Sequence, residues 1–405
     1  MGRGSGLKSS AVVALGILGT FAAAGPGYAA TLKATPSIAL EETWDTNIFN
    51  TASDEQSDFI SRATPGLSFL FESERATFTL SGSITSEAYA DNHDLNNWDS
   101  TKRVELGAPS LKASQRLSLR AAARYLETND ISRRNELALA PIPDLPPAET
   151  LVVGRTATRV YGGSVGASYQ ATPNIELGAG GGGTKTEYLE RATGLTGSRT
   201  VTGSVSGRYR FSPRTTGGVT GSTASTAYDD GAHSRSHSAG LTGSFALTER
   251  TGIEASAGAT FVTDTRATGV VERDQSPYGR LSISHRAGSF SATLAGAYEL
   301  SGGGSFGQAT ERTNASLALA DQLTPKWSWD INGYYQNERT AYAGGGREIE
   351  TAGGTAGVRF AAADWIAFRL AGYTFRQWNR DTADSDIARS HVVLGLTLSD
   401  TSILF

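Results

Sequence analysis

Ten arginines share one phase of an alternating polar and apolar pattern, and they are the residues of this sequence best suited to binding chemistry. They are Arg62, Arg103, Arg120, Arg124, Arg208, Arg210, Arg280, Arg312, Arg359 and Arg369. Guanidinium groups stay charged, bind carboxylates and phosphates through paired hydrogen bonds, and attract anions when they line a confined aqueous path. The acids Glu105, Glu176, Glu254, Glu299 and Asp330 occupy the same phase. The pattern therefore predicts either a route for anionic solutes or Arg–Glu ladders that only stiffen a solvated wall.

Signals for catalysis or metal binding are weak. The chain has no Cys, and His233, His237, His285 and His391 lack the spacing of a metal site. No Gly-x-Ser-x-Gly elbow lies between a strand and a helix, and the Gly-rich run 178–183 has no helix after it that would make it a phosphate loop. We therefore predict no enzyme, no cofactor and no metal. The formal net charge of -4 gives no basic surface for nucleic acid.

The elements that must position the arginines are β-strands. In the stretch 327–336, Trp327, Trp329, Ile331 and Tyr335 fall on one face, while Asp330 falls on the other. Similar segments recur along the chain, with tight turns at intervals of about 40 residues. About nine polar loops alternate with about eight short turns, which predicts about 18 strands of roughly 10–14 residues.

Such a string of hairpins can form a soluble sandwich or a membrane barrel. Apolar faces rich in Ala and Gly, aromatic residues beside the short turns and the terminal Phe405 favour the barrel. We predict an all-β fold, a single transmembrane antiparallel up-and-down β-barrel over residues 30–405. Its short turns are expected to be periplasmic and its longer loops extracellular, in the outer membrane of a Gram-negative bacterium, with lipid around it. We expect a monomer.

Residues 1–29 have the pattern of a cleaved signal peptide. Arg3 and Lys8 supply positive charge, an apolar run follows over 11–24, and Ala29 ends a stretch of small residues. The mature chain is therefore expected to begin near residue 30, after export.

The stretch 129–156 is the longest predicted loop. It carries Arg133, Arg134, Pro141, Pro143 and Pro146. Long loops in compact domains are commonly functional or disordered. The sequence leaves open whether this loop folds into the pore as a constriction, covers the mouth as a lid, or is a mobile surface loop.

The first predicted hairpin resembles a family of outer-membrane β-barrel porins associated with exopolysaccharide gene clusters. The segments that carry the resemblance are Trp44-Asp-Thr-Asn-Ile-Phe49, Ser57-Asp-Phe-Ile-Ser-Arg62 and Pro65-Gly-Leu-Ser68. The motif covers only about residues 40–70. The rest of the chain shares with the family the pattern of repeated hairpins rather than the sequence. The resemblance implies an outer-membrane barrel and a role in polysaccharide export, and it supplies no catalytic motif. Read without it, Asp45 and Asn47 suit an Asx-type turn, and Asp58 and Arg62 are expected to pair.

From these patterns we predict a passive conduit that exports a secreted, acidic polysaccharide through an Arg-bearing lumen. Periplasmic export or polymerisation proteins would supply the polymer. The alternatives are a general or anion-selective diffusion porin, an outer-membrane enzyme, and a closed structural barrel.

Overall fold

The computed structural model describes residues 30–129, 156–189, 196–301, 309–340, 348–380, 385–400 and 402–403. The strands are β1 (Ala30–Asp45), β2 (Asp58–Ser73), β3 (Ala76–Tyr89), β4 (Asn97–Lys112), β5 (Leu117–Thr128), β6 (Thr158–Thr172), β7 (Ile175–Tyr188), β8 (Ser198–Ser212), β9 (Thr215–Tyr228), β10 (His233–Ala246), β11 (Thr251–Thr265), β12 (Val271–Ala287), β13 (Phe290–Ser301), β14 (Thr310–Asp321), β15 (Trp327–Thr340), β16 (Glu348–Ala363), β17 (Ile366–Asn379), β18 (Ile387–Ser399) and β19 (Ser402–Ile403). A single helical turn, η1 (His93–Leu95), lies between β3 and β4.

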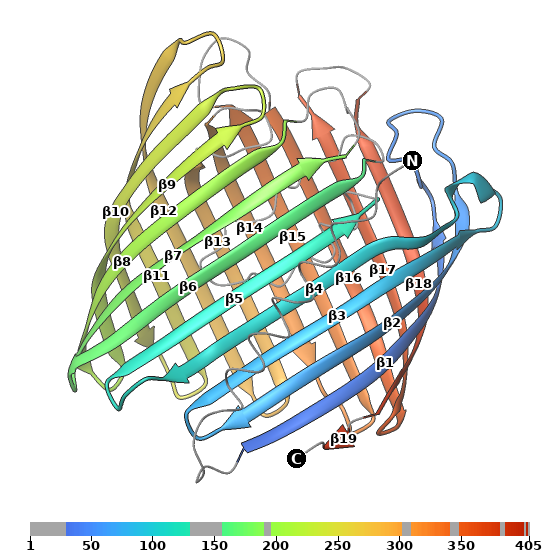
Figure 1. The fold of residues 1–405 in the computed structure, drawn as a ribbon, viewed down its shortest axis with the longest axis horizontal. Coiled ribbons are helices and arrows are strands. Elements are labelled where there is room, and N and C mark those ends of the chain that lie inside the picture. Colours follow the sequence, from blue (N-terminus) through green and yellow to red (C-terminus); the bar gives the residue numbers. More distant parts are fainter. Residues whose placement is uncertain are drawn as a thin grey trace, which may run out of the picture.

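The strands close into one antiparallel barrel (Figure 1). Each strand from β1 to β18 pairs with the next in sequence, and β18 returns to pair with β1 from Ser37 opposite Ser399 to Asp45 opposite His391. The two-residue β19 continues the line of β18 along β1 at the short-turn end. Closure gives most backbone groups along the strands partners within the wall, which a strand in lipid requires. The predicted barrel of about 18 strands is confirmed. No described helix is long and apolar enough to cross a membrane.

The strands are longer than the sequence predicts. From β1 to β18 their lengths run from 12 residues in β5 to 17 in β12. β12 already begins at Val271, so it includes part of the polar stretch 266–275, which the sequence pattern predicts as a loop. Charged residues such as Arg273 hid this extension, because they break the apolar alternation by which a barrel strand is recognised in a sequence. The predicted signal segment 1–29, and Arg133, Arg134, Pro141, Pro143 and Pro146 of the predicted constriction loop, lie outside the described residues.

The apolar phase of the strands faces outward. Ile331 is 42% exposed, Leu394 58% and Val205 62%, although all three are aliphatic. The bulky aromatic residues Trp327, Trp365 and Phe211 are also exposed and lie at or beside the short turns. An exposed apolar band bordered by aromatic residues is the surface that a transmembrane barrel presents to lipid.

Gly258 on β11 shows how close packing fixes the inner wall. A Cβ there would sit 2.6 Å from Cε1 of Tyr278 and would also clash with the backbone carbonyl of Ala239. We expect Gly258→Ala to lower the free energy of unfolding by about 1–3 kcal/mol, as overpacking does. Gly372→Ala is the control, because no neighbouring atom lies within 4 Å of its Cβ position. Denaturant unfolding in detergent micelles measures both, and equal losses would contradict the prediction.

Candidate functional site

The ten predicted arginines all lie on the inward phase of their strands. Arg369, for example, lies between Phe368 and Leu370, both of which are exposed on the outer surface. Arg208 likewise alternates with the exposed Val205 and Tyr209. Successive residues of a strand point to opposite faces, so the arginines point toward the lumen. The polar phase read from the sequence is therefore the inner wall of the barrel.

At least five of the ten form ion pairs with acids on the same wall. The pairs are Arg62–Glu87 at 2.9 Å, Arg103–Glu105 at 2.8 Å, Arg280–Glu299 at 2.5 Å, Arg369–Asp330 at 3.2 Å, and Arg312–Glu338. All but Arg103–Glu105 join different strands. Much of the positive charge is thus compensated within the wall, and these pairs stiffen it.

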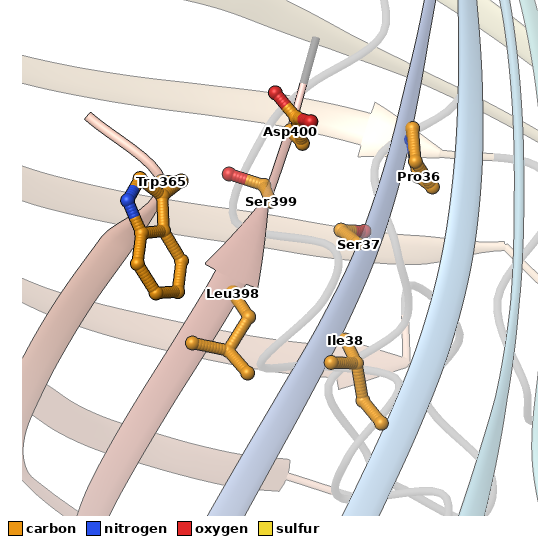
Figure 2. A pocket seen from close by; sticks show the side chains of 7 residues that line it. All are labelled: Pro36, Ser37, Ile38, Trp365, Leu398, Ser399 and Asp400. Atoms are coloured by element: carbon orange, nitrogen blue, oxygen red, sulfur yellow. The ribbon is translucent and has the colours of Figure 1, made fainter. Parts of the chain in front are cut away.

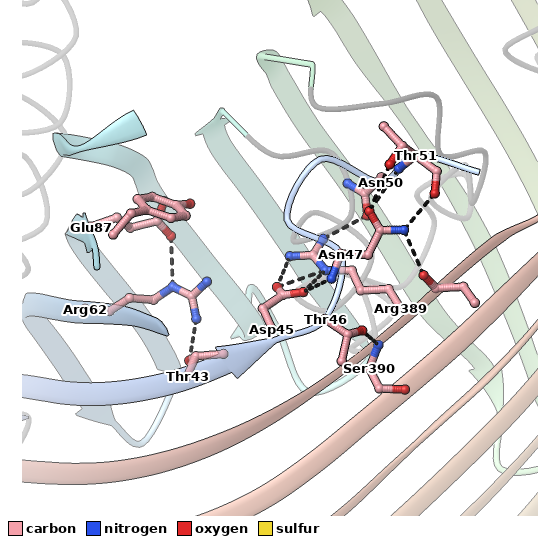
Figure 3. Close-up of polar contacts among 12 residues, drawn as sticks. Thr43, Asp45, Thr46, Asn47, Asn50, Thr51, Arg62, Glu87, Arg389 and Ser390 are labelled. Atoms are coloured by element: carbon pink, nitrogen blue, oxygen red, sulfur yellow. Dashed lines mark hydrogen bonds and ion pairs between the residues drawn. The ribbon is translucent and has the colours of Figure 1, made fainter. Parts of the chain in front are cut away.

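The sequence predicts an ion pair between Arg62 and Asp58, and the structure does not form it. The Arg62 guanidinium donates to Glu87 on β3 and to the hydroxyl of Thr43 on β1 (Figure 3). Asp58 accepts hydrogen bonds from the backbone and side-chain amides of Asn92. Strand pairing explains the error, because Arg62 lies directly opposite Glu87 in the β2–β3 register.

Arg208 and Arg210 line a polar cavity at the short-turn end of the inner wall. The cavity has a volume of about 280 Å³ and is also lined by Glu176 and Glu254. Within the described part of the chain, neither arginine forms an ion pair, and Arg359 forms none either. Two guanidinium groups with unsaturated hydrogen-bonding capacity can therefore receive a carboxylate or phosphate from solution.

Above this cavity the inner wall carries small residues. They include Gly178, Gly180 and Gly182 on β7, Thr202, Ser204 and Ser206 on β8, and, beyond β9, Ser236 and Ser238 on β10. Glycine in a strand leaves space for another group to approach the backbone closely. This part of the wall is uncharged and takes little volume from the lumen.

At the loop end, a buried polar cluster ties the β1–β2 loop to β18 (Figure 3). Both carboxylate oxygens of Asp45 accept hydrogen bonds at 3.0 Å from Nε of Arg389. Arg389 also donates to Asn50 at 3.0 Å, and Asn47 donates its amide to the Thr51 and Ala388 carbonyls. The backbone N–H of Asn47 donates to Asp45 at 3.1 Å, which confirms the predicted Asx-type turn.

The same loop packs against the inner wall through Ile48. Ile48 and Ile60 are each 1% exposed and form a cluster with Tyr89, flanked by Phe49. Ile60 and Tyr89 lie on the inward phase, opposite to the exposed Phe59. The β1–β2 loop therefore lies against the lumen side of the mouth and narrows it.

A second apolar cluster brings opposite walls together, and we call it the loop-end constriction. Tyr373, Phe375 and Ile387 of β17 and β18 pack together, and Tyr188 of β7 packs against them. Around the barrel, β8 to β16 separate β7 from β17 on one side, and β18 and β1 to β6 separate them on the other. Contact between strands so far apart requires side chains that cross the lumen. The passage is therefore narrowed at this level by described residues.

Sequence reasoning missed the constriction residues and Arg389. One signal was available, since Tyr373 and Phe375 are aromatic residues on the same phase as Arg369. An aromatic residue on the polar phase of a barrel strand marks a site where an apolar side chain, rather than water alone, occupies the lumen. Nothing in the sequence pairs Tyr188 with that segment.

A pocket of about 520 Å³ opens on the wall where β1 meets the end of β18 (Figure 2). Ile38, Leu398 and Trp365 line it, so it is apolar. Pro36 of β1 lies beside it. Because proline lacks an N–H, the ladder along β1 is interrupted between the part that pairs with β18 and the part that pairs with β19. The position of the pocket on the outward phase at the short-turn end makes it a lipid-facing notch rather than part of the lumen.

The described residues hold no group of three or more His, Asp or Glu side chains placed to bind a metal ion. Of the histidines, His233, His237 and His285 lie on the outward phase, while His391 lies inside and stacks on Tyr373.

Comparison with models of protein families finds no match, and no curated protein matches the sequence. Among solved structures, OpdK from Pseudomonas aeruginosa, crystallised with vanillate, is 13% identical with a TM-score of 0.47, covering 91% of this chain and 99% of that one. OccK2 from Pseudomonas aeruginosa is 12% identical with a TM-score of 0.48, covering 91% and 98%. OccAB4 from Acinetobacter baumannii is 11% identical with a TM-score of 0.45, covering 91% and 98%.

The barrel's own geometry supports the placement in a membrane. Its wall is closed by antiparallel pairing, its outer surface is apolar, and its inner surface carries arginines, acids, Ser and Thr. A closed barrel with a lipid-facing outer surface and a polar interior is the transmembrane structure of the Gram-negative outer membrane. The chain is a transmembrane β-barrel of the outer-membrane type.

Proposed function

We propose that the protein is a passive diffusion channel that favours small anionic solutes. The observation that carries this proposal is the cavity that holds Arg208 and Arg210, where two guanidinium groups have no ion-pair partner among the described residues. Arginines in the wall of a confined aqueous path raise the local concentration of anions. Carboxylates small enough to enter a cavity of about 280 Å³ are the solutes that this site suits best.

Export of an acidic polysaccharide is the second candidate, and the resemblance over residues 40–70 favours it. A polymer needs a continuous passage, whereas at the loop-end constriction Tyr188 packs against the cluster on the opposite wall. Small solutes need less separation of these walls, so the constriction favours diffusion over export. A strain that lacks the gene distinguishes the two, because only an exporter's loss abolishes secreted polysaccharide. Three points remain predictions: the periplasmic proteins that would supply an exporter with polymer, the monomeric state and the cleaved signal peptide.

We expect Arg208→Gln combined with Arg210→Gln to shift the reversal potential toward cations. Removing both cations leaves Glu176 and Glu254 to set the potential of the cavity. The measurement is the reversal potential of purified protein in a planar bilayer under a salt gradient, at low ionic strength where screening is weak.

The matched control replaces the two acids of the same cavity. Glu176→Gln combined with Glu254→Gln is expected to shift the reversal potential toward anions. If both pairs of variants leave the reversal potential unchanged, the cavity does not select ions and the anion preference is wrong.

A further inference from the structure

The wall is not uniformly joined, and the exception lies between β12 and β13. On its other side β12 pairs with β11 along its whole length, from Val271 to His285. With β13 it pairs only between Gly279 and Ala287. Within the described residues, no strand pairs with the β13-facing edge of β12 from Val271 to Tyr278. The gap lies at the loop end, where the β11–β12 hairpin rises at the upper left of Figure 1.

Pro277 explains where the ladder stops. Residues of an antiparallel strand direct their backbone groups alternately to the two neighbouring strands. Arg286 donates to the carbonyl of Arg250, and the carbonyl of Val270 accepts from Arg266, so the even-numbered positions of β12 bond toward β11. Odd-numbered positions therefore face β13, and Pro277 is one of them. Proline has no N–H to donate, so the ladder ends at Gly279, the last position on that edge before Pro277.

Beyond Gly279 the two strands overlap instead of lying edge to edge. The Ser276 and Tyr298 hydroxyls are 3.1 Å apart. Ser276 is out of phase with the exposed Leu281 and so points inward, whereas Tyr298 is in phase with the exposed Leu294 and points outward. An inward side chain of β12 can meet an outward side chain of β13 only if β12 passes outside β13.

Contacts deeper in the joint agree with this overlap. Val262, on the inward phase of β11, packs against Leu300 and Ala309, although β12 and β13 lie between β11 and β14 in the sheet. The carboxylate of Asp264 accepts a hydrogen bond at 2.5 Å from the backbone N–H of Ala309. The end of β13 and the start of β14 therefore lie on the lumen side of the β11–β12 hairpin.

We define the overlap joint as Val262, Asp264, Ser276, Tyr298, Leu300 and Ala309. Its contacts include the bond from the backbone N–H of Ala309 to Asp264 and the contact between the Ser276 and Tyr298 hydroxyls, and no ladder joins β12 and β13 there among the described residues. Elsewhere, separating two strands of the wall would expose a row of backbone groups to lipid, which is costly. Opening the joint breaks no backbone ladder among the described residues, because β12 and β13 pair only as far as Gly279.

We propose that the overlap joint is a lateral port between the lumen and the lipid-facing surface of the barrel at its loop end. Its chemistry suits an amphiphile with an uncharged hydroxylated head group. Val262, Leu300 and Ala309 would contact the alkyl chain, while Asp264 and the Ser276 and Tyr298 hydroxyls would bond the head group. The proposal rests on the proposed function in one respect, since it requires a water-filled lumen from which the amphiphile enters.

The test uses an alkyl glucoside with a photoreactive diazirine in its chain, added to the full-length protein in liposomes. The chain has no Cys, so the pair Val262→Cys and Leu300→Cys provides a lock that oxidation closes and reductant reopens. We expect photolabelling of Ala309 and its neighbours in the reduced form, and a several-fold loss of that labelling in the oxidised form. Equal labelling of both forms, or labelling confined to outer residues such as Leu281, would overturn the proposal.

Two further variants make the result independent of the lock. Ala239→Cys with Ala259→Cys places a disulfide across two strands that remain paired, and should leave the labelling unchanged. Pro277→Val restores the missing N–H on the β13-facing edge and should lower the labelling without any disulfide. Unchanged labelling in Pro277→Val would also overturn the proposal.

Ion conductance separates this proposal from the channel function. A barrel that conducts ions but shows no labelling of the joint keeps the channel function and loses the port. If the joint is labelled but the barrel conducts no ions, the joint is accessible from lipid, and both the diffusion function and entry from the lumen are wrong.

Discussion

Replacing Tyr188 and Phe375 with Ala raises the single-channel conductance several-fold. Tyr188 on β7 and Phe375 on β17 belong to the loop-end constriction, where side chains of opposite walls meet across the lumen. Conductance is limited by the narrowest part of the path, and apolar side chains at that point also repel water. Removing both rings separates the walls and wets the passage. Planar-bilayer recordings of the purified barrel measure the change.

The control is an aromatic residue at the same end but on the other face. Tyr161 on β6 is 40% exposed on the outer surface and packs against Tyr125 with the two rings tilted, so Tyr161→Ala should leave the conductance unchanged. Single replacements of Tyr188 or Phe375 should each give an intermediate rise. A double variant that conducts like the parent protein would show that the constriction does not limit the current.

Asp45→Ala is expected to lower the free energy of unfolding by about 3–5 kcal/mol, the usual cost of leaving one member of a buried ion pair alone. The side chains of Asp45 and Arg389 are 1% and 4% exposed. Without the carboxylate, the Arg389 guanidinium stays buried beside Asn50 with its main charge partner gone. Because the pair joins β1 to β18, the loss falls where the barrel closes. Denaturant unfolding in detergent micelles, followed by Trp fluorescence, measures it.

Two comparisons test whether burial is the cause. Asp45→Asn with Arg389→Gln removes both charges and should cost less than Asp45→Ala, because no unpaired charge remains. Glu72→Ala breaks the exposed Lys33–Glu72 pair, whose side chains are 34% and 45% exposed, and should change stability by no more than about 1 kcal/mol. Similar losses for Glu72→Ala and Asp45→Ala would mean that burial does not set the cost.

The polar face of the wall could be predicted because it depends only on neighbouring residues. Arg369 alternates with Phe368 and Leu370 in the chain, and a strand turns that alternation into an inside and an outside whatever its neighbours are. Ion-pair partners were harder to predict, because they depend on which strands lie side by side and in which register. Arg62 meets Glu87 rather than Asp58 for that reason.

The sequence alone determined that this chain is a string of hairpins with a polar and an apolar face, since both follow from a period of two residues and from turn chemistry. Only the tertiary structure decided where the lumen narrows, that β18 holds the partner of Asp45, and that β12 passes outside β13. These features join residues such as Tyr188 and Tyr373, or Asp45 and Arg389, that are far apart in the chain. Their meeting depends on barrel closure and strand tilt, which no local pattern of residues contains.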